Sequence, residues 1–396
     1  MNLKISANQI EELLTRGVSE VIVRDRLKKR LEAGEILRLK FGIDPTGYDL
    51  HLGHIVPLRC LKRWQNAGHQ VVIIIGDYTA QIGDPTGQDK TRPTLTHEKV
   101  LDFAKDYLKQ IFKILDKEKT EIRYQAEWFE KFNLQTVFEL CSKYTVKQML
   151  ARETFRERLK KEAPFSIHEM LYPLLQGYDS VAIKADVEFG GIEQKFNLLV
   201  GRDIQRAYGQ HQQDVVMTPI LLGTDGREKM SKSLNNYIGI MESPKEMYGK
   251  IMSIPDKLIL PYFELCTNLT TNEIAEIKKE ITFKNPKVLK MRLARTIVTL
   301  YHSISDAQKA EEEFERVFKK KKAPLDIPVF EVKEKKDILA LLVETKLASS
   351  KSEAKRLIFQ GGVEINNEKI NDWQKVILPQ AGMIIKAGKR KFVKIK

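Results

Sequence analysis

Strand and helix patterns alternate along the chain up to about residue 225. Residues 1–35 carry apolar side chains at helical spacing, which predicts helix there. Two further helices are expected at 53–66 and 96–115. Strands are expected at five short apolar runs, namely 37–44, 70–76, 121–125, 181–187 and 214–222. This alternation is typical of an α/β domain with a parallel sheet, whose ligands bind at the carboxyl ends of the strands.

The pattern changes after about residue 240. Strand signals vanish, and residues 273–318 carry apolar side chains at helical spacing among many charges, which predicts a small helical domain. Four consecutive lysines at 319–322 and two prolines soon after them indicate a linker. A compact third unit follows, with two helices, a Gly-Gly pair and short alternating strands. The sequence therefore predicts four segments, namely 1–240, 241–322, 323–336 and 337–396.

The composition excludes several classes of protein. With 396 residues, 42% hydrophobic and 30% charged, the chain is neither disordered overall nor expected to span a membrane. Its start lacks the pattern of a signal peptide. Three scattered cysteines are too few for a disulfide framework or a zinc site, and each is expected to be a small buried residue. These features predict a cytoplasmic protein.

The charge is unevenly distributed. The chain has 67 Lys and Arg against 53 Asp and Glu, a net charge of +14. Residues 331–396 hold 15 basic and 8 acidic residues, so about a sixth of the chain carries half of the excess. Such an excess favours a polyanionic partner such as a nucleic acid, although a solvated basic surface is the alternative.

Two motifs far apart in the chain carry the clearest chemistry. The run His51-Leu-Gly-His54 stands at the start of a predicted helix, and Lys229-Met-Ser-Lys232-Ser lies far downstream. A helix start offers free N–H groups to an anion, and the glycine lets a ligand approach the backbone. The two histidines can face one phosphate, to which the two lysines would bring two more cations. Such a site would stabilise the charge that develops when a nucleophile displaces pyrophosphate. Either motif alone would be a weaker signal.

The two motifs resemble the HIGH and KMSKS signatures of class I aminoacyl-tRNA synthetases. Three further runs are similar to bacterial tyrosyl-tRNA synthetases, namely Phe41-Gly-Ile-Asp-Pro-Thr46, Ile82-Gly-Asp-Pro-Thr-Gly87 and Tyr172-Pro-Leu-Leu-Gln-Gly-Tyr-Asp179. The resemblance covers the whole chain. It implies a Rossmann-like doubly wound parallel sheet, then a helical domain on the anticodon side and a small α+β RNA-binding module. Lys40 stands where the better-known branch of the family has a tyrosine, and here the chain is similar to a second bacterial branch.

The resemblance also implies which residues hold the substrates. The catalytic positions are His51, His54, Lys229 and Lys232, and the ATP site is built around Gly42, Asp44, Thr46, Gly53, Gln194 and Lys232. Tyrosine is expected to lie against Thr79, Asp84, Gln125, Tyr172, Gln176 and Asp179. Lys90 and Arg92 are expected to hold pyrophosphate. Asp179 is expected to bind the tyrosine hydroxyl, with Lys40 as the next candidate. Independently of the resemblance, Tyr172, Gln176 and Asp179 are spaced by four and then three residues, which places them on one helix face.

The C-terminal segment resembles a small RNA-binding module first seen in a ribosomal protein. Ser350 is expected to cap a helix, with Glu353 completing a capping box. Lys351, Lys355 and Arg356 then lie near one face, where they could contact RNA phosphates. A solvated basic helix is the alternative.

The expected function is ligation of tyrosine to tRNA(Tyr) through tyrosyl-adenylate. The resemblance implies that Mg²⁺ enters with ATP, that the protein holds no metal of its own, and that it is a homodimer. Two alternatives stay open: activation of tryptophan, and an RNA-binding protein without catalysis. On spacing alone, Tyr172 and Tyr178 could also be core aromatics, and the run from Asp84 to Gly87 could be only a turn.

Overall fold

The computed structural model describes residues 3–84, 95–164, 166–318, 328–332, 334–366, 368–388 and 391–396. These residues form two compact units, Met1–Ile304 and Ser305–Lys396. Lys90 and Arg92, expected to hold pyrophosphate, lie outside the described residues.

No helix in the described part is long and apolar enough to cross a membrane. Cys60 and Cys266 are buried as expected, whereas Cys141 is partly exposed; all three are unpaired.

The first unit is built on a six-stranded sheet with the order β1-β6-β5-β2-β3-β4. Its strands are β1 (Glu20–Ile22), β2 (Arg38–Ile43), β3 (Gln70–Ile75), β4 (Thr120–Tyr124), β5 (Val187–Gly191) and β6 (Asp214–Thr218). Neighbouring strands are parallel, except that β1 runs antiparallel to β6. The five β3 residues 71–75 are fully buried, as their apolar β-branched run predicts. The α/β prediction is confirmed.

Two strand and helix predictions were wrong. Residues 1–35 contain the edge strand β1, because pairing with β6 outweighs the local helical spacing. Residues 181–183 end a helix, and the strand begins only at Val187. Val181 and Ile183 are apolar because they face the core from that helix, and so short an apolar run does not distinguish a helix end from a strand.

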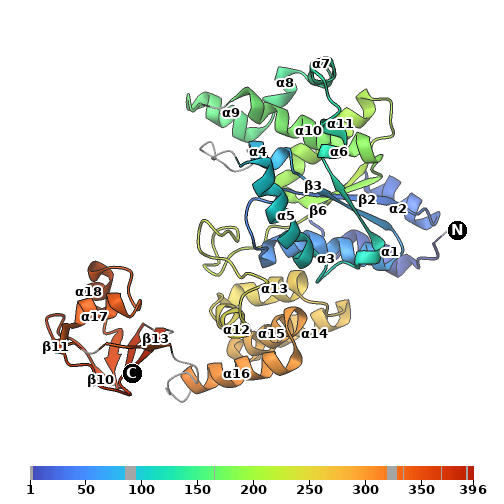
Figure 1. Cartoon of the computed structure of the whole chain (residues 1–396). Helices are drawn as coiled ribbons and strands as arrows, with labels where there is room; N and C mark the ends of the chain where they lie inside the picture. Colours follow the sequence, from blue (N-terminus) through green and yellow to red (C-terminus); the bar gives the residue numbers. More distant parts are fainter. Residues whose placement is uncertain are drawn as a thin grey trace. The chain divides into compact units, whose positions relative to one another are not determined.

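Helices cover both faces of the sheet (Figure 1). One face carries α10 (Ile167–Ile183) and α11 (Lys195–Ala207), which pack along each other; the other carries α1 (Ala7–Thr15) and α3 (Leu52–Asn66). The remaining helical elements around the sheet are α2 (Arg24–Glu32), α4 (Thr79–Ile82), α5 (His97–Ile111), η1 (Lys117–Lys119), α6 (Ala126–Phe129), α7 (Leu134–Ser142), α8 (Val146–Met149), α9 (Glu153–Lys160) and η2 (Ile192–Gln194). This arrangement leaves the carboxyl ends of the strands open for a site.

The chain turns helical after the sheet, as predicted. The helices are α12 (Pro244–Met252), η3 (Asp256–Leu258), α13 (Ile259–Cys266), α14 (Thr271–Glu280) and α15 (Pro286–Tyr301). Here α12 packs against α15, and α13 packs against α3 of the sheet domain. This helical part therefore belongs to the same compact unit as the sheet.

The second unit contains a small α+β module. The unit begins with α16 (Ile304–Phe318). The elements of the module are β7 (Val329–Phe330), β8 (Lys336–Asp337), α17 (Ile338–Glu344), α18 (Lys351–Phe359), β9 (Val363–Ile365), β10 (Glu368–Lys369), β11 (Val376–Ile377), β12 (Ile384–Ala387) and β13 (Lys391–Ile395). The sheet order β10-β9-β12-β13-β7 places β7 beside β13. Part of the expected linker 323–336 is therefore a strand of this module. Its backbone pairing depends on residues more than sixty positions away, which a charge run and prolines cannot reveal.

Candidate active site

A pocket of about 370 Å³ lies at the carboxyl ends of the parallel strands. Asp44 follows β2, Thr79 follows β3, Gln125 follows β4 and Gln194 follows β5, and all four line it. The chain passes from β2 to β3 in one direction and from β5 to β6 in the other. Such a reversal opens a crevice between the central strands, and ligands of doubly wound sheets bind there.

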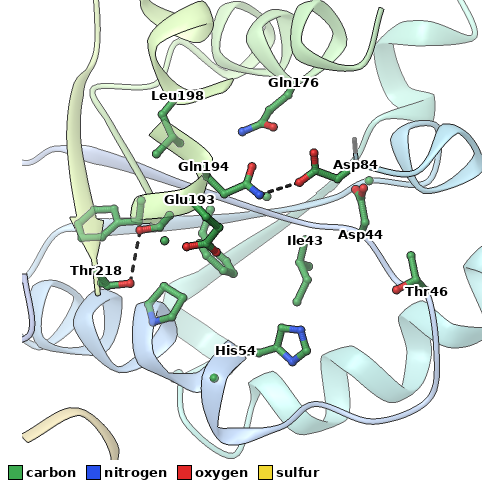
Figure 2. Close-up of a pocket in the computed structure, with 18 of the residues that line it drawn as sticks. Ile43, Asp44, Thr46, His54, Asp84, Gln176, Glu193, Gln194, Leu198 and Thr218 are labelled. Atoms are coloured by element: carbon green, nitrogen blue, oxygen red, sulfur yellow. Dashed lines mark hydrogen bonds between the residues drawn. The ribbon is translucent and has the colours of Figure 1, made fainter. Parts of the chain in front are cut away.

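The structure brings most of the predicted site residues together. Those lining this pocket are Gly42, Asp44, Thr46, His51, Gly53, His54, Thr79, Asp84, Gln125, Tyr172, Gln176, Asp179, Gln194 and Lys229. In Figure 2, Asp44 and Thr46 lie on one side of the open space, Gln194 and Glu193 lie opposite, and His54 approaches from α3. Lys232 does not line the pocket, but its charge acts on both histidines.

The start of α3 forms the phosphate side of the pocket. His51 is the residue before the helix, and its ring stacks on the His54 ring with centroids 3.8 Å apart. A Cβ at Gly53 would come within 3.0 Å of the His51 ring, so glycine lets that ring fold over the helix start. Free N–H groups of the first turn and two imidazoles thus face the same space.

The two histidines are neutral at physiological pH, which corrects the expectation that they act as cations. Burial, with the nearby His54 ring and the charge of Lys232 adding to it, lowers the pKa of His51 to about 2. Burial and Lys232 lower the pKa of His54 to about 4. The His51 amide N–H donates to His54 Nδ1 at 3.3 Å. His54 therefore carries its proton on Nε2, where the neutral ring can donate it to a phosphate oxygen.

The lysine motif lies in a loop, as predicted, and Asn236 holds that loop in place. Asn236 accepts from the Ser231 amide at 2.8 Å, and its side-chain nitrogen donates to the Lys229 carbonyl at 3.1 Å. Asn236 is buried. Within the motif, partial burial of the Lys232 ammonium lowers the pKa of that lysine. Asn236 was not among the residues predicted from the sequence. Its position just after the motif is the only signal that could have pointed to it.

Asp44 is fixed between two other parts of the fold. Its carboxylate accepts from Thr79 Oγ1 at 2.7 Å and from the Tyr172 hydroxyl at 2.8 Å. A Cβ at Gly76 would collide with the same carboxylate, so the turn after β3 needs glycine there. These contacts join the ends of β2 and β3 to α10. Tyr172 is therefore a pocket residue and not only a core aromatic.

Asp179 closes the other end of the pocket. One carboxylate oxygen accepts from Gln125 Nε2 at 2.8 Å, and the other accepts from Trp128 Nε1 at 3.1 Å. Burial raises the pKa of Asp179 to about 7, although the charge of Lys40 opposes the rise. Trp128 was missed. Its place three residues after Gln125, on the same helical turn, is a signal that could have found it.

Lys40 does not line the pocket, so it is wrong as the second candidate for a tyrosine hydroxyl. It is fully buried, and its Nζ lies 2.9 Å from Glu188 Oε1. The same Nζ donates to the Gln176 carbonyl at 2.7 Å and to Ser180 Oγ at 2.8 Å. Lys40 thus holds α10 against the sheet from behind the pocket.

Asp84 pairs across the pocket. Its carboxylate accepts from Gln194 Nε2 at 2.6 Å (Figure 2) and lies 3.2 Å from the buried Arg152 guanidinium. The side chain therefore does more than cap a turn. Arg152 was missed, and no sequence signal pointed to it, because it reaches Asp84 from 68 residues away.

The basic C-terminal helix differs in detail from its prediction. Ser350 caps α18 by accepting from the Glu353 amide, as expected. The Glu353 carboxylate, however, accepts from the amide and hydroxyl of Ser349, so no capping box forms. Lys351 is exposed, whereas Lys355 lies 3.7 Å from the centre of the Trp373 ring. The Lys355 ammonium therefore lies over an aromatic ring, and its side chain is half-buried.

Comparisons with known proteins agree with one another. Residues 32–319 match the family described as tRNA synthetases class I (W and Y), and residues 313–395 match the tyrosine–tRNA ligase SYY-like C-terminal domain. The chain is 53% identical over 391 residues to a tyrosine–tRNA ligase of Dehalococcoides mccartyi, covering 98% of each. It is 50% identical over 386 residues to one of Thermotoga maritima, covering 97% of this chain and 96% of that one.

Solved structures share the fold. A tyrosyl-tRNA synthetase from Archaeoglobus fulgidus, complexed with L-tyrosine, superposes with a TM-score of 0.61 at 22% identity over 78% of this chain and 99% of that one. A C-terminally truncated mitochondrial tyrosyl-tRNA synthetase from Aspergillus nidulans gives 0.66 at 22% identity, over 78% and 94%.

Proposed function

The chain belongs to the class I tRNA synthetases and is a tyrosine–tRNA ligase, and we propose that the pocket at its strand ends is where tyrosine and ATP react. One observation carries the proposal: a helix start with two imidazoles faces the same cavity as a row of buried groups suited to an amino acid. The family resemblance assigns the same two halves to ATP and tyrosine.

The proposed reaction has two steps and no covalent enzyme intermediate. The tyrosine carboxylate attacks the α-phosphate, and pyrophosphate leaves with the electrons of the broken P–O bond. A ribose hydroxyl of the tRNA 3′ end then displaces AMP from the adenylate. His54 Nε2–H, the first amides of α3, Lys229 and Lys232 would stabilise charge that grows on the phosphate oxygens. Asp44, Thr46 and Gln194 would position the nucleotide.

Tyrosine would lie with its amino group toward Thr79 and Asp84 and its ring between Gln125, Tyr172 and Gln176. Its hydroxyl would then reach Asp179. ATP–pyrophosphate exchange tests the assignment: the chain should support exchange with tyrosine, and neither with tryptophan nor without an amino acid. Exchange with tryptophan at the same rate would contradict the assignment of the pocket.

Magnesium is proposed to enter with ATP, bound to its phosphates. Among the described residues, no group of three or more His, Cys, Asp or Glu side chains could hold a metal ion. Mg²⁺ would supply charge neutralisation of the leaving pyrophosphate, and the protein residues do the positioning.

Selection of tyrosine over phenylalanine should depend on Asp179. A phenylalanine ring cannot add the hydroxyl hydrogen bond to those that the buried carboxylate accepts from Gln125 and Trp128, and losing a hydrogen bond to such a group costs about 1–3 kcal/mol. We expect Asp179→Ala to reduce discrimination by about 5- to 150-fold. The ratio of kcat/KM for the two amino acids in adenylate formation measures this. Glu130→Ala, which changes a carboxylate near Tyr78 outside the pocket lining, is the control.

Preserved discrimination in Asp179→Ala would place the hydroxyl partner elsewhere. Since Lys40 lies outside the pocket, the next candidates are Gln125, which donates to Asp179, and Gln176, which lies three residues before Asp179 on α10. Either would then become the residue to test.

Contact with tRNA(Tyr) is proposed for the C-terminal module. The +7 charge of residues 331–396 and the exposed Lys351 and Arg356 on α18 support it. We further propose that residues 241–322 face the anticodon side of the tRNA, as the resemblance implies.

Truncation after residue 323 should separate activation from transfer. Every residue assigned to ATP and tyrosine precedes this point, so adenylate formation should proceed at close to the full rate. If three phosphate contacts are lost, the slope of tRNA binding against salt should fall by about three units. Three phosphate contacts make the affinity for tRNA fall by about 40-fold between 50 and 200 mM salt, and the truncated chain should lack this part of the salt dependence. Normal charging of tRNA by the truncated chain would show that the module is not the RNA anchor.

A homodimer in the cytoplasm is proposed on the family resemblance. Several large apolar side chains between α7 and α10 are exposed, namely Leu134, Phe138, Val146, Leu159 and Ile167. Exposed apolar residues in such number support a surface that is covered in an assembly. The three unpaired cysteines fit a reducing compartment.

A further inference from the structure

A second pocket, of about 470 Å³, lies away from the strand ends. Its walls come from α1, α3, the residues after α5, the connection between α13 and α14, and the end of α15. All of these belong to the first compact unit, and no described residue lines both this pocket and the active site. The pocket has no part in the proposed reaction.

The lining of this pocket is strongly basic. Its five basic residues are Arg16, Arg59, Lys62, Arg63 and Lys113. Glu12 is the only acidic residue among its described lining, and its carboxylate lies 2.8 Å from the Arg16 guanidinium. Four cations are therefore left without a carboxylate in the lining. We call this cavity the basic pocket.

Two arginines of α3 are held in the basic pocket with hydrogen-bonding capacity to spare. Arg59, only 7% exposed, donates from a terminal nitrogen to Asn268, and Arg63 donates likewise to the Arg16 carbonyl. The Nε atoms of Arg59 and Arg63 are buried and have no partner in the described part of the chain. Burial, together with the charges of Arg16 and Arg59, lowers the pKa of Arg63. A buried donor without an acceptor is costly, and so is a gathering of like charges.

We propose that the basic pocket binds a small phosphate-bearing anion. A phosphoryl group accepts from guanidinium forks at several positions, and its negative charge relieves the repulsion among the cations. A purely structural role would explain the contacts of Arg59 and Arg63 to Asn268 and to backbone. It would also explain why Lys62 donates to Gln65 and Lys113 to the Tyr301 carbonyl, but it leaves the Nε atoms of Arg59 and Arg63 without acceptors in the described part of the chain.

A small ligand is favoured over an RNA backbone. The volume lies within the range of small-molecule pockets, and five separate segments surround it. Because α3 carries the catalytic histidines at one end and Arg59, Lys62 and Arg63 in its later turns, an occupant would contact the helix that serves the active site.

Calorimetric titration of the full-length protein with tripolyphosphate tests the proposal. Lys62→Met and Arg63→Met should each weaken binding at one site about tenfold or more, as expected for a lost charge-assisted hydrogen bond. Lys62 is only half-buried, and its Nζ donates to Gln65 on the same helix, so Lys62→Met should disturb the fold less than Arg63→Met does. It therefore keeps the proposal testable if Arg63→Met fails to fold. Arg206→Met, at an exposed arginine on α11, is the matched control and should bind as the wild type does.

The catalytic pocket could also take tripolyphosphate, and Lys229→Met, which removes a cation lining that pocket, separates the two sites. Binding that survives Lys229→Met and weakens in Lys62→Met supports the basic pocket. Binding that is lost in Lys229→Met and unchanged in Lys62→Met overturns the proposal. If Lys62→Met weakens binding of tRNA but not of tripolyphosphate, the pocket serves an RNA phosphate, and the small-ligand proposal is wrong. Failure of tyrosine activation would leave these titrations unaffected, so the two proposals fail independently.

Discussion

Replacing His54 with alanine should slow formation of tyrosyl-adenylate by about a hundredfold to a thousandfold, while tyrosine affinity stays nearly unchanged. The lost group is a neutral Nε2–H donor whose orientation the His51 amide fixes through Nδ1. A donor aimed at charge that appears only in the transition state contributes to kcat and little to ground-state binding. Single-turnover adenylate formation gives the rate, and equilibrium titration with tyrosine gives the affinity.

His54→Gln is the matched variant, since its amide can donate from a similar place and should recover part of the rate. His51→Ala should also slow the reaction, because it removes the ring that stacks on His54. Since the pKa values of both histidines lie at about 4 or below, kcat/KM for ATP at saturating tyrosine should show no histidine titration near neutral pH. Equal loss of tyrosine binding in both alanine variants would overturn the assignment to the phosphate side.

Breaking the ion pair behind the pocket should have the largest effect on stability. Lys40 and Glu188 lie 2.9 Å apart, and each is at most 1% exposed. Removing one partner leaves an uncompensated buried charge, so Lys40→Met or Glu188→Leu should lower the free energy of unfolding by about 3–5 kcal/mol. Urea unfolding, followed by circular dichroism, measures the loss.

The double variant Lys40→Met, Glu188→Leu provides the control. With both charges gone, it should be more stable than either single variant. Single-variant losses below about 1 kcal/mol would show that water or other groups compensate the buried charge that remains. Glu188 also accepts from Gln176 and Gln213, so its loss should disturb the pocket side of α10 more than the loss of Lys40 does.

The sequence identified the site where local spacing determines geometry. Asp44 and Gln125 are each the last residue of a predicted strand, and strand ends of a parallel sheet meet at one edge. Tyr172, Gln176 and Asp179 follow helical spacing, and α10 places them all in the pocket. The family resemblance supplied their roles, which spacing could not.

What the sequence missed depends on contacts between distant residues or on burial. Arg152 reaches Asp84 across 68 residues, and Lys40 meets Glu188 from a different strand. The neutral state of His51 and His54 follows from desolvation, which a motif does not encode. The edge strand β1 exists only because β6 pairs with it.

The clamp on Asp179 bears on redesign of the pocket for other amino acids. Gln125 and Trp128 each hold one of its two oxygens, and Gln125 also accepts from the Thr79 amide at the opposite side of the tyrosine site. A single substitution would therefore leave a hydrogen-bond donor or acceptor without its partner and displace the neighbouring side chains. The effects of substitutions at these positions on activity should therefore not be additive. Libraries that vary positions 125, 128 and 179 together should yield new specificities that stepwise mutagenesis would pass over.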